Sequence, residues 1–245
     1  MAHGTPDWGV TAGAVTTYQV TDLGELAVRL GSPISHDRRG DVIWWDDFEC
    51  TLNKWQATLF SADASATLSD VRARNGRYSA LLISGSDVVD FAEIRHHSPY
   101  PALSHMGFEY SFHNLTSIGD LTLLCIVFDG VNATWFRVKW DNVLNTLSYF
   151  NSAGVWVSLD ASLNLIATTG YFHTWKLVFD AAAGRFVRLL LDDVTYSLAG
   201  IAGYSFADAS TPQLMASAIV GYRAGGSSSV YVDDAIITQN EPANP

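Results

Sequence analysis

The sequence predicts an all-β protein built as a two-sheet antiparallel sandwich. From Asp41 onward, short apolar or alternating runs follow one another, and turn signals such as Asn75-Gly76 and Asp129-Gly130 separate them. No helical pattern is found in this region. Hydrophobic residues make up 48% of the 245 residues, which is enough for a full core. Many strands at short intervals over about 200 residues are typical of a sandwich.

The apolar and alternating runs define the expected strands. Turn signals at Asn75-Gly76, Asp129-Gly130, Gly154 and Gly184 lie between them. The predicted strands are 42–49, 55–60, 66–73, 77–84, 88–97, 106–114, 120–128, 134–140, 145–150, 155–158, 172–180, 185–192, 214–221 and 229–238.

Residues 1–40 differ from the rest and are expected to form an N-terminal extended arm with one short helix. The arm is rich in Gly, Thr and Ala, and within it Leu23, Leu26 and Leu30 recur at helical spacing. Asp22 can cap a helix, which we expect over about 22–30 before Gly31 ends it. Residues 41–240 then form the sandwich, and 241–245 a C-terminal tail. We expect the arm to pack on its own domain or on neighbouring subunits.

Charge and composition exclude several classes of function. The formal net charge is −11, with 14 Lys plus Arg against 25 Asp plus Glu, and no basic stripe is present, so nucleic-acid binding is disfavoured. No apolar run reaches the length of a membrane span. The first residues lack a signal-peptide pattern, so synthesis in a cytoplasm is expected. Cys50 and Cys125 form no metal pattern and are expected to be buried free thiols, with a disulfide bridge between them as the alternative.

Three stretches resemble a known family. "FHTWKLVFDAAAGRFVRLLLDDVTYSLAG" at 172–200 is a strand, a glycine turn and a strand that ends in two aspartates. Together with "WWDDFE" at 44–49 and "VYVDDAIIT" at 230–238, it resembles the concanavalin A-like or laminin-G-like jelly roll, over roughly residues 42–238. The resemblance implies that the first and last strands of the sandwich lie side by side, so the two acidic segments would be neighbours.

The acidic segments suggest a cation site. Side chains alternate along a strand, so Asp233 and Asp234 should point to opposite faces, and a buried carboxylate needs a partner. The resemblance to carbohydrate-binding modules implies a structural calcium ion held by Asp47, Glu49 and Asp233. The segment after Glu49, "CTLN", departs from the family pattern. Alternatively, these acids cap turns and pair with arginine or backbone amides.

Aromatic residues suggest a sugar site. The chain has eight tryptophans, and a flat indole suits the C–H face of a pyranose. Trp44, Trp135 and Trp175 sit in alternating runs that predict core packing. Trp156, beside a turn in "NSAGVWVSLD", is the candidate for glycan binding.

Catalytic residues are not expected, with one alternative. The glucanase pattern Glu-x-Asp-x-x-Glu is absent. Glu93, Arg95 and His97 share one strand face in "FAEIRHHSPYP", with Tyr100 nearby. Jelly-roll polysaccharide lyases use Arg, His and Tyr to remove the C5 proton of a uronate, so the resemblance implies a lyase as one alternative. A strand of alternating ion pairs explains the same residues.

The composition and resemblance together favour a non-catalytic structural or adhesive protein. We expect a subunit of a larger assembly such as a phage virion, as a capsid decoration or minor structural protein at the particle surface. Its partners would be copies of itself or capsid proteins, contacted through the arm. The first alternative is a carbohydrate-binding module that attaches to cell-surface glycan, and the second is a polysaccharide lyase or hydrolase.

Overall fold

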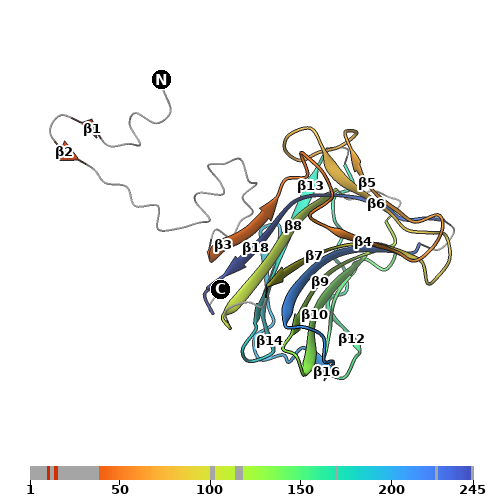
Figure 1. Cartoon of the computed structure of the whole chain (residues 1–245). Coiled ribbons are helices and arrows are strands. Elements are labelled where there is room, and N and C mark those ends of the chain that lie inside the picture. The colour runs from red at the N-terminus through yellow and green to blue at the C-terminus, as the bar shows by residue number, and fades with distance from the viewer. Residues whose placement is uncertain are drawn as a thin grey trace.

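In the computed structural model, two antiparallel sheets of eight strands each face one another (Figure 1). The structure describes residues 39–99, 103–113, 118–168, 170–223 and 226–243, and the backbone of Val10–Thr11 and Ala14–Val15. These two short segments, β1 and β2, pair with each other. The helix predicted at 22–30 lies outside the described residues. The predicted all-β sandwich is confirmed.

Sheet 1 is the sheet to which the last strand of the chain belongs. Its order is β15-β14-β13-β8-β18-β6-β5, and β3 also pairs with β18, beyond the point where β6 ends. Its strands are β3 (Asp41–Asp46), β5 (Ser65–Ser69), β6 (Ser79–Ile83), β8 (His105–His113), β13 (Phe172–Asp180), β14 (Arg185–Leu191), β15 (Val194–Ser197) and β18 (Ser229–Gln239).

Sheet 2 forms the other layer. Its order is β12-β11-β10-β9-β17-β7-β4, and β16 pairs with β10. Its strands are β4 (Gln56–Leu59), β7 (Phe91–Pro99), β9 (Asp120–Phe128), β10 (Asn132–Asp141), β11 (Thr146–Phe150), β12 (Trp156–Asp160), β16 (Tyr204–Ala207) and β17 (Gln213–Gly221).

The predicted strands all occur, with differences at their ends. The strand predicted to begin at residue 88 begins at Phe91, because Val88 and Val89 lie exposed in a turn that the bond from Asp90 N to Asp87 O closes. Two strands of the sandwich, β15 and β16, were not predicted, and neither were the two-residue strands β1 and β2. Every residue of β15 and β16 is exposed or half-buried, so neither has the pattern of a buried strand.

Aromatic side chains join the two sheets across the core. Phe136 of β10 stacks on Phe179 of β13, with ring centroids 4.4 Å apart. Tyr110 of β8 donates a hydrogen bond from its hydroxyl to the carbonyl oxygen of Thr122 on β9, at 3.0 Å. Trp175 is fully buried beside Tyr110, as its alternating run predicts. The core therefore holds the sheets in a fixed relation and supports the residues on their outer faces.

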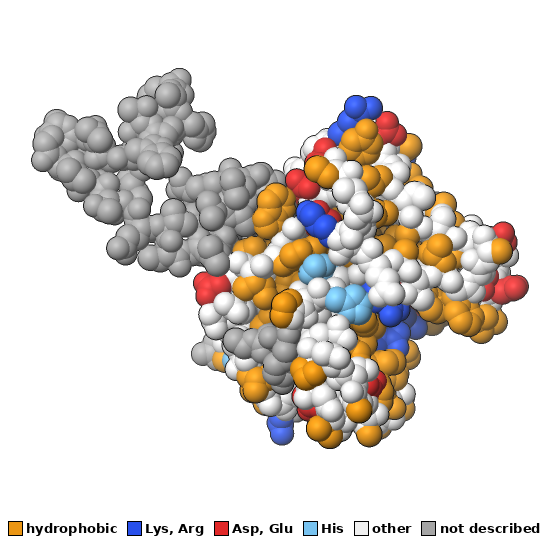
Figure 2. Space-filling view, in the orientation of Figure 1, with side chains coloured by type: hydrophobic (Ala, Val, Ile, Leu, Met, Phe, Trp, Pro, Cys, Tyr) orange, Lys and Arg blue, Asp and Glu red, His pale blue; other side chains and the backbone are white. Residues whose placement is uncertain are grey.

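A second, smaller apolar cluster lies on the outer face of sheet 2. Its buried members are Leu124, Ile126, Ala133 and Met215, and Phe128, Trp135, Phe206 and Ile219 pack against them. Strand β9 is consequently buried on both faces. In the view of Figure 2, uncharged and hydrophobic side chains predominate at the surface and charged ones are few. Among the described residues, no helix has the length and apolarity that crossing a membrane requires.

Candidate functional site

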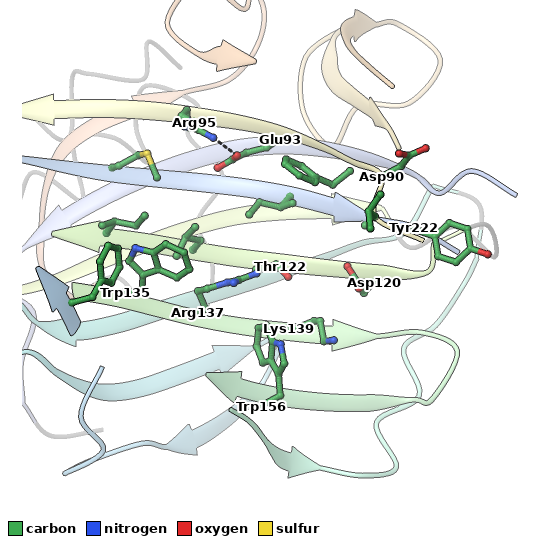
Figure 3. Close-up of a pocket in the computed structure, with 18 of the residues that line it drawn as sticks. Asp90, Glu93, Arg95, Asp120, Thr122, Trp135, Arg137, Lys139, Trp156 and Tyr222 are labelled. Atoms are coloured by element: carbon green, nitrogen blue, oxygen red, sulfur yellow. Dashed lines mark hydrogen bonds and ion pairs between the residues drawn. The ribbon is translucent and has the colours of Figure 1, made fainter. Parts of the chain in front are cut away.

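A groove of about 750 Å³ runs over the outer face of sheet 2 (Figure 3). The small apolar cluster forms part of its floor. Charged and aromatic side chains from β7, β9, β10 and β12 rise around that floor, and residues that adjoin β7 and β17 close one end. Its polar and aromatic lining residues include Asp90, Phe91, Glu93, Arg95, Asp120, Thr122, Trp135, Arg137, Lys139, Trp156, Phe206, Asp208 and Tyr222.

Strand register brings these residues together. Side chains that alternate along a strand line up in rows across a sheet. One row of Cα partners runs Arg95, Ser217, Leu124 and Arg137, and the next runs Glu93, Ile219, Thr122 and Lys139. The two rows carry most of the charge in the groove.

Aromatic rings surround Arg137. Its guanidinium carbon lies 5.5 Å from the ring centroid of Trp135, 5.4 Å from that of Phe150 and 5.1 Å from that of Trp156. Burial lowers the pKa of Arg137, against the opposing effect of the Asp120 and Glu93 charges. The ammonium of Lys139 lies 4.8 Å from the same Trp156 ring. Cation–π contacts at these distances hold both side chains in place.

Acidic groups also line the groove. Glu93, which is almost fully buried, forms an ion pair with Arg95 (Figure 3). Burial also raises the pKa of Asp120, while the nearby Lys139 charge opposes that shift. A buried carboxylate keeps its charge at a cost unless a cation or donor compensates it. Glu93 has such a cation in Arg95.

The proposed lyase residues are only partly together. Glu93 and Arg95 both line the groove. His97 continues along the same face of β7, but its Nδ1 contacts Gln213 Oε1 at 2.9 Å and its Nε2 contacts Gln56 Oε1 at 3.0 Å. Both imidazole nitrogens therefore have protein partners. Tyr100 lies outside the described residues.

One tryptophan lies on a different face of its strand from the one predicted. Trp156 lines the groove, as its role as the glycan candidate requires. Trp135 was expected in the core and is instead on the groove face, because it alternates with the buried Phe136. Arg137 and Lys139 were not predicted as site residues. Alternation in "TWFRVKW" places both on the face of Trp135, so the signal was present in the sequence.

The two acidic ends of the sandwich are neighbours. Strands β3 and β18 pair antiparallel, with Ala235 opposite Asp46. Asp46 is buried and accepts hydrogen bonds from the indole nitrogen of Trp55 at 2.7 Å and from the ammonium of Lys54 at 2.6 Å. These contacts confirm the adjacency of the first and last strands that the resemblance implied.

Asp233 and Asp234 do not point to opposite faces, contrary to the prediction. Asp234 has a φ of 56°, and the register with β8 shifts at this point, which marks a β-bulge. Both carboxylates are buried and reach the same turn. Asp233 accepts a hydrogen bond from Arg74 N at 2.7 Å, and Asp234 accepts one from Asn75 Nδ2 at 3.1 Å. Burial raises the pKa of Asp233 to about 7 and that of Asp234 to about 8.

The oxygens nominated for calcium are largely engaged by donors. Glu49 Oε1 accepts hydrogen bonds from the backbone of Arg77 and Tyr78, at 2.7 and 2.8 Å, and Asp47 Oδ1 accepts one from Glu49 N at 3.2 Å. Asp234 Oδ1 is buried and has no hydrogen-bond partner. Within the described ranges, no three His, Cys, Asp or Glu side chains form a group able to hold a metal ion. Calcium binding therefore stays a prediction, which the unpartnered Oδ1 of Asp234 supports.

The comparisons with known proteins agree on the fold. No protein-family model and no curated protein matches the sequence. A Bacillus subtilis protein with a galectin-like fold shares this architecture, with a TM-score of 0.52 and 9% identity over 82% of this chain and 97% of that one. The fold is a concanavalin A-like jelly roll.

Two further solved structures share this jelly roll. An endo-β-1,4-glucuronan lyase from Trichoderma reesei has a TM-score of 0.50 and 11% identity, over 81% of this chain and 95% of that one. A sialidase has a TM-score of 0.51 and 12% identity over 82% of this chain, which corresponds to 19% of the sialidase. The chain thus spans about a fifth of the sialidase that it matches. At these identities the likeness concerns the jelly roll and not the groove residues.

Proposed function

We propose that this protein is a non-catalytic adhesive module that binds a saccharide in the groove on sheet 2. The observation that carries the proposal is the combination of aromatic rings and fixed charged groups on an outer sheet face. A volume of about 750 Å³ lies in the range of ligand sites, roughly 300 to 1,000 Å³. The jelly roll alone assigns no activity, since one fold hosts many functions.

The lining of the groove suits an amphipathic ligand. A sugar ring offers C–H faces for groove aromatics such as Phe206, and hydroxyl groups for Arg95, Thr122 and Asp120. The apolar cluster beneath these groups keeps the floor dry. Hydrogen bonds made over such a floor compete with less water than those at an open surface.

The state of Glu93 and His97 favours binding over catalysis. A general base must be able to take a proton from the substrate, yet Glu93 is ion-paired with Arg95 and both nitrogens of His97 are bonded to glutamines. A polysaccharide lyase remains the alternative. Incubation with glucuronan, alginate and polygalacturonate tests it, because a lyase releases unsaturated products that absorb ultraviolet light.

Our proposal includes display of the module on a larger particle such as a virion. The low proportion of charged residues, 16%, and the Gly-, Thr- and Ala-rich first 40 residues support it. A chain that lacks residues 1–40 should keep its glycan binding and lose its place in the particle. Retention of the truncated chain in the particle would reject the arm as the anchor.

A glycan array with a matched pair of variants tests the saccharide site. Trp156→Ala removes a groove ring, and Tyr171→Ala removes an exposed ring outside the groove. The wild-type protein and Tyr171→Ala should bind the same glycans, and Trp156→Ala should bind them at least tenfold more weakly. Equal binding by all three would place the site elsewhere, and no binding by the wild-type protein would reject the function.

A further inference from the structure

We propose that the groove selects an acidic saccharide, whose carboxylate binds between Arg137 and Lys139. The inference rests on the proposed function and names its class of ligand. The two cations are neighbours on one face of β10, with Cα atoms about 7 Å apart by strand geometry. Figure 3 shows them on the same side of the groove, beside Trp156.

The aromatic rings here position cations. Trp156 contacts both Arg137 and Lys139, and Trp135 and Phe150 contact Arg137 from other sides. A ring occupied by a cation offers less of its face to a sugar. These rings therefore orient positive charge toward the ligand, and charge becomes the basis of recognition.

The charges of Asp120 and Glu93 act on Arg137 from a distance, but no described carboxylate lies within ion-pair distance of either cation. Within the part of the chain that the structure describes, Arg137 and Lys139 have no ion pair, whereas Arg95 is paired with Glu93. The buried Nε of Arg137 and the indole nitrogen of Trp135 have no hydrogen-bond partner there. Both of these atoms are donors, so each lacks an acceptor.

A carboxylate supplies what is missing. It carries negative charge, presents two acceptor oxygens, and matches the planar fork of a guanidinium. The protein as a whole has a net charge of −11, which would repel an acidic polymer elsewhere on its surface. A local pair of fixed cations therefore determines where such a polymer can approach. A uronate polymer offers both the carboxylate and a chain of sugar rings that can follow the groove.

Polygalacturonate and its fully methyl-esterified form provide a matched pair of probes. They differ in the charge of each residue and share the sugar backbone. Glucuronan, alginate and neutral cello-oligosaccharides extend the panel to other linkages. Binding to the full-length protein is measured by calorimetry at two salt concentrations, because Coulombic attraction weakens as ionic strength rises.

Three variants separate charge from packing. Arg137→Met removes the charge and keeps an apolar side chain between the rings, Arg137→Lys restores the charge without the fork, and Lys139→Met removes the second cation. Arg77→Met is the control, because Arg77 is exposed and lies outside the groove. Circular dichroism and thermal unfolding show whether each variant is folded.

The proposal predicts that at least one acidic polymer binds, that its neutral counterpart binds at least tenfold more weakly, and that salt weakens the binding. Loss of a charge-assisted hydrogen bond weakens binding by about tenfold to hundredfold. The Kd of Arg137→Met for the acidic polymer should therefore rise by a factor in that range, and the Kd of Arg137→Lys should lie between those of Arg137→Met and the wild type. If Arg137→Met does not fold, Lys139→Met carries the test, with a loss of about threefold or more.

Other outcomes would overturn the inference in distinguishable ways. Groove-dependent binding of neutral glycans, with equal or weaker binding of the acidic ones, would leave the proposed function standing and remove its acidic ligand. If Arg137→Met and Lys139→Met bind the acidic polymer as tightly as the wild type does, the proposed function would stand, but these two residues would not be its carboxylate site. No binding of any glycan would reject the proposed function together with this inference.

Discussion

Glu241 anchors the C-terminal end of the sandwich through a buried charge network, and replacing it with glutamine should destabilise the fold. Its Oε1 lies 2.6 Å from the ammonium of Lys176, and its Oε2 lies 2.7 Å from a terminal nitrogen of Arg188. The hydroxyl of Thr238 donates to Oε1 at 2.5 Å. Glu241→Gln keeps the shape and removes the charge that the two cations share.

The magnitude follows from burial. The side chains of Lys176 and Arg188 are 2% and 1% exposed, so water cannot replace the lost carboxylate. Breaking a buried ion pair costs about 3 to 5 kcal/mol. Glu109, also buried and opposite Lys176 in the sheet, provides a second carboxyl group near that cation. We therefore expect the lower end, about 3 kcal/mol, or about 6 to 12 °C in Tm.

Urea unfolding of matched variants measures this cost. The control is Asp70→Asn, because Asp70 and Arg77 form an ion pair at 3.8 Å with side chains 57% and 71% exposed. An exposed pair contributes less than about 1 kcal/mol, so this variant should unfold like the wild type. If Glu241→Gln lowers the free energy of unfolding no more than Asp70→Asn does, the network does not stabilise the tail and our reasoning is wrong.

Three other properties follow from the described contacts. Because the pKa values of Asp233 and Asp234 are raised, the folded state binds protons more tightly than the unfolded chain does, and the free energy of unfolding should fall as pH rises from about 4 through 8. Asp234→Asn should flatten this pH dependence, and an unchanged slope would contradict the pKa shifts. If the unpartnered oxygen of Asp234 is a calcium ligand, the Tm of the wild type should be higher with calcium than with a chelator, and the Tm of Asp234→Asn should not differ between the two. An equal wild-type Tm in both conditions would reject the predicted calcium site. A thiol reagent should label one cysteine of the native protein, because Cys50 is exposed and Cys125 is buried; rapid labelling of both would show that the core opens.

Most strands could be predicted because their apolar pattern is local. Strand β9 was located correctly from a continuous apolar run, yet that run does not reveal that its outer side chains, such as Leu124 and Ile126, form the floor of a groove. Trp135 was assigned to the core because alternation divides a strand into two faces without saying which one is inside. Which face packs against the opposite sheet depends on strands that are distant in the sequence, so the sequence of the strand alone does not determine it.

The acidic segments show the same limit. Their adjacency was predicted, since it follows from the topology of the jelly roll. The bulge at Asp234 was not, because a positive φ at a non-glycine residue leaves no signal in composition. The free state of both cysteines was expected and is confirmed, but Cys50 is exposed where burial was expected. The partners of His97, Gln56 and Gln213, lie too far along the chain to be read from its neighbours.

The placement of the last two strands has a consequence for synthesis on the ribosome. In sheet 1, β18 lies between β8 on one side and β6 and β3 on the other, and in sheet 2, β17 lies between β9 and β7. Both sheets therefore lack an interior strand until residues 213–239 have been translated. Until then, β8 and β6 in sheet 1 and β9 and β7 in sheet 2 present open strand edges. Emergence of β17 and β18 from the ribosome therefore sets the moment at which this sandwich can close.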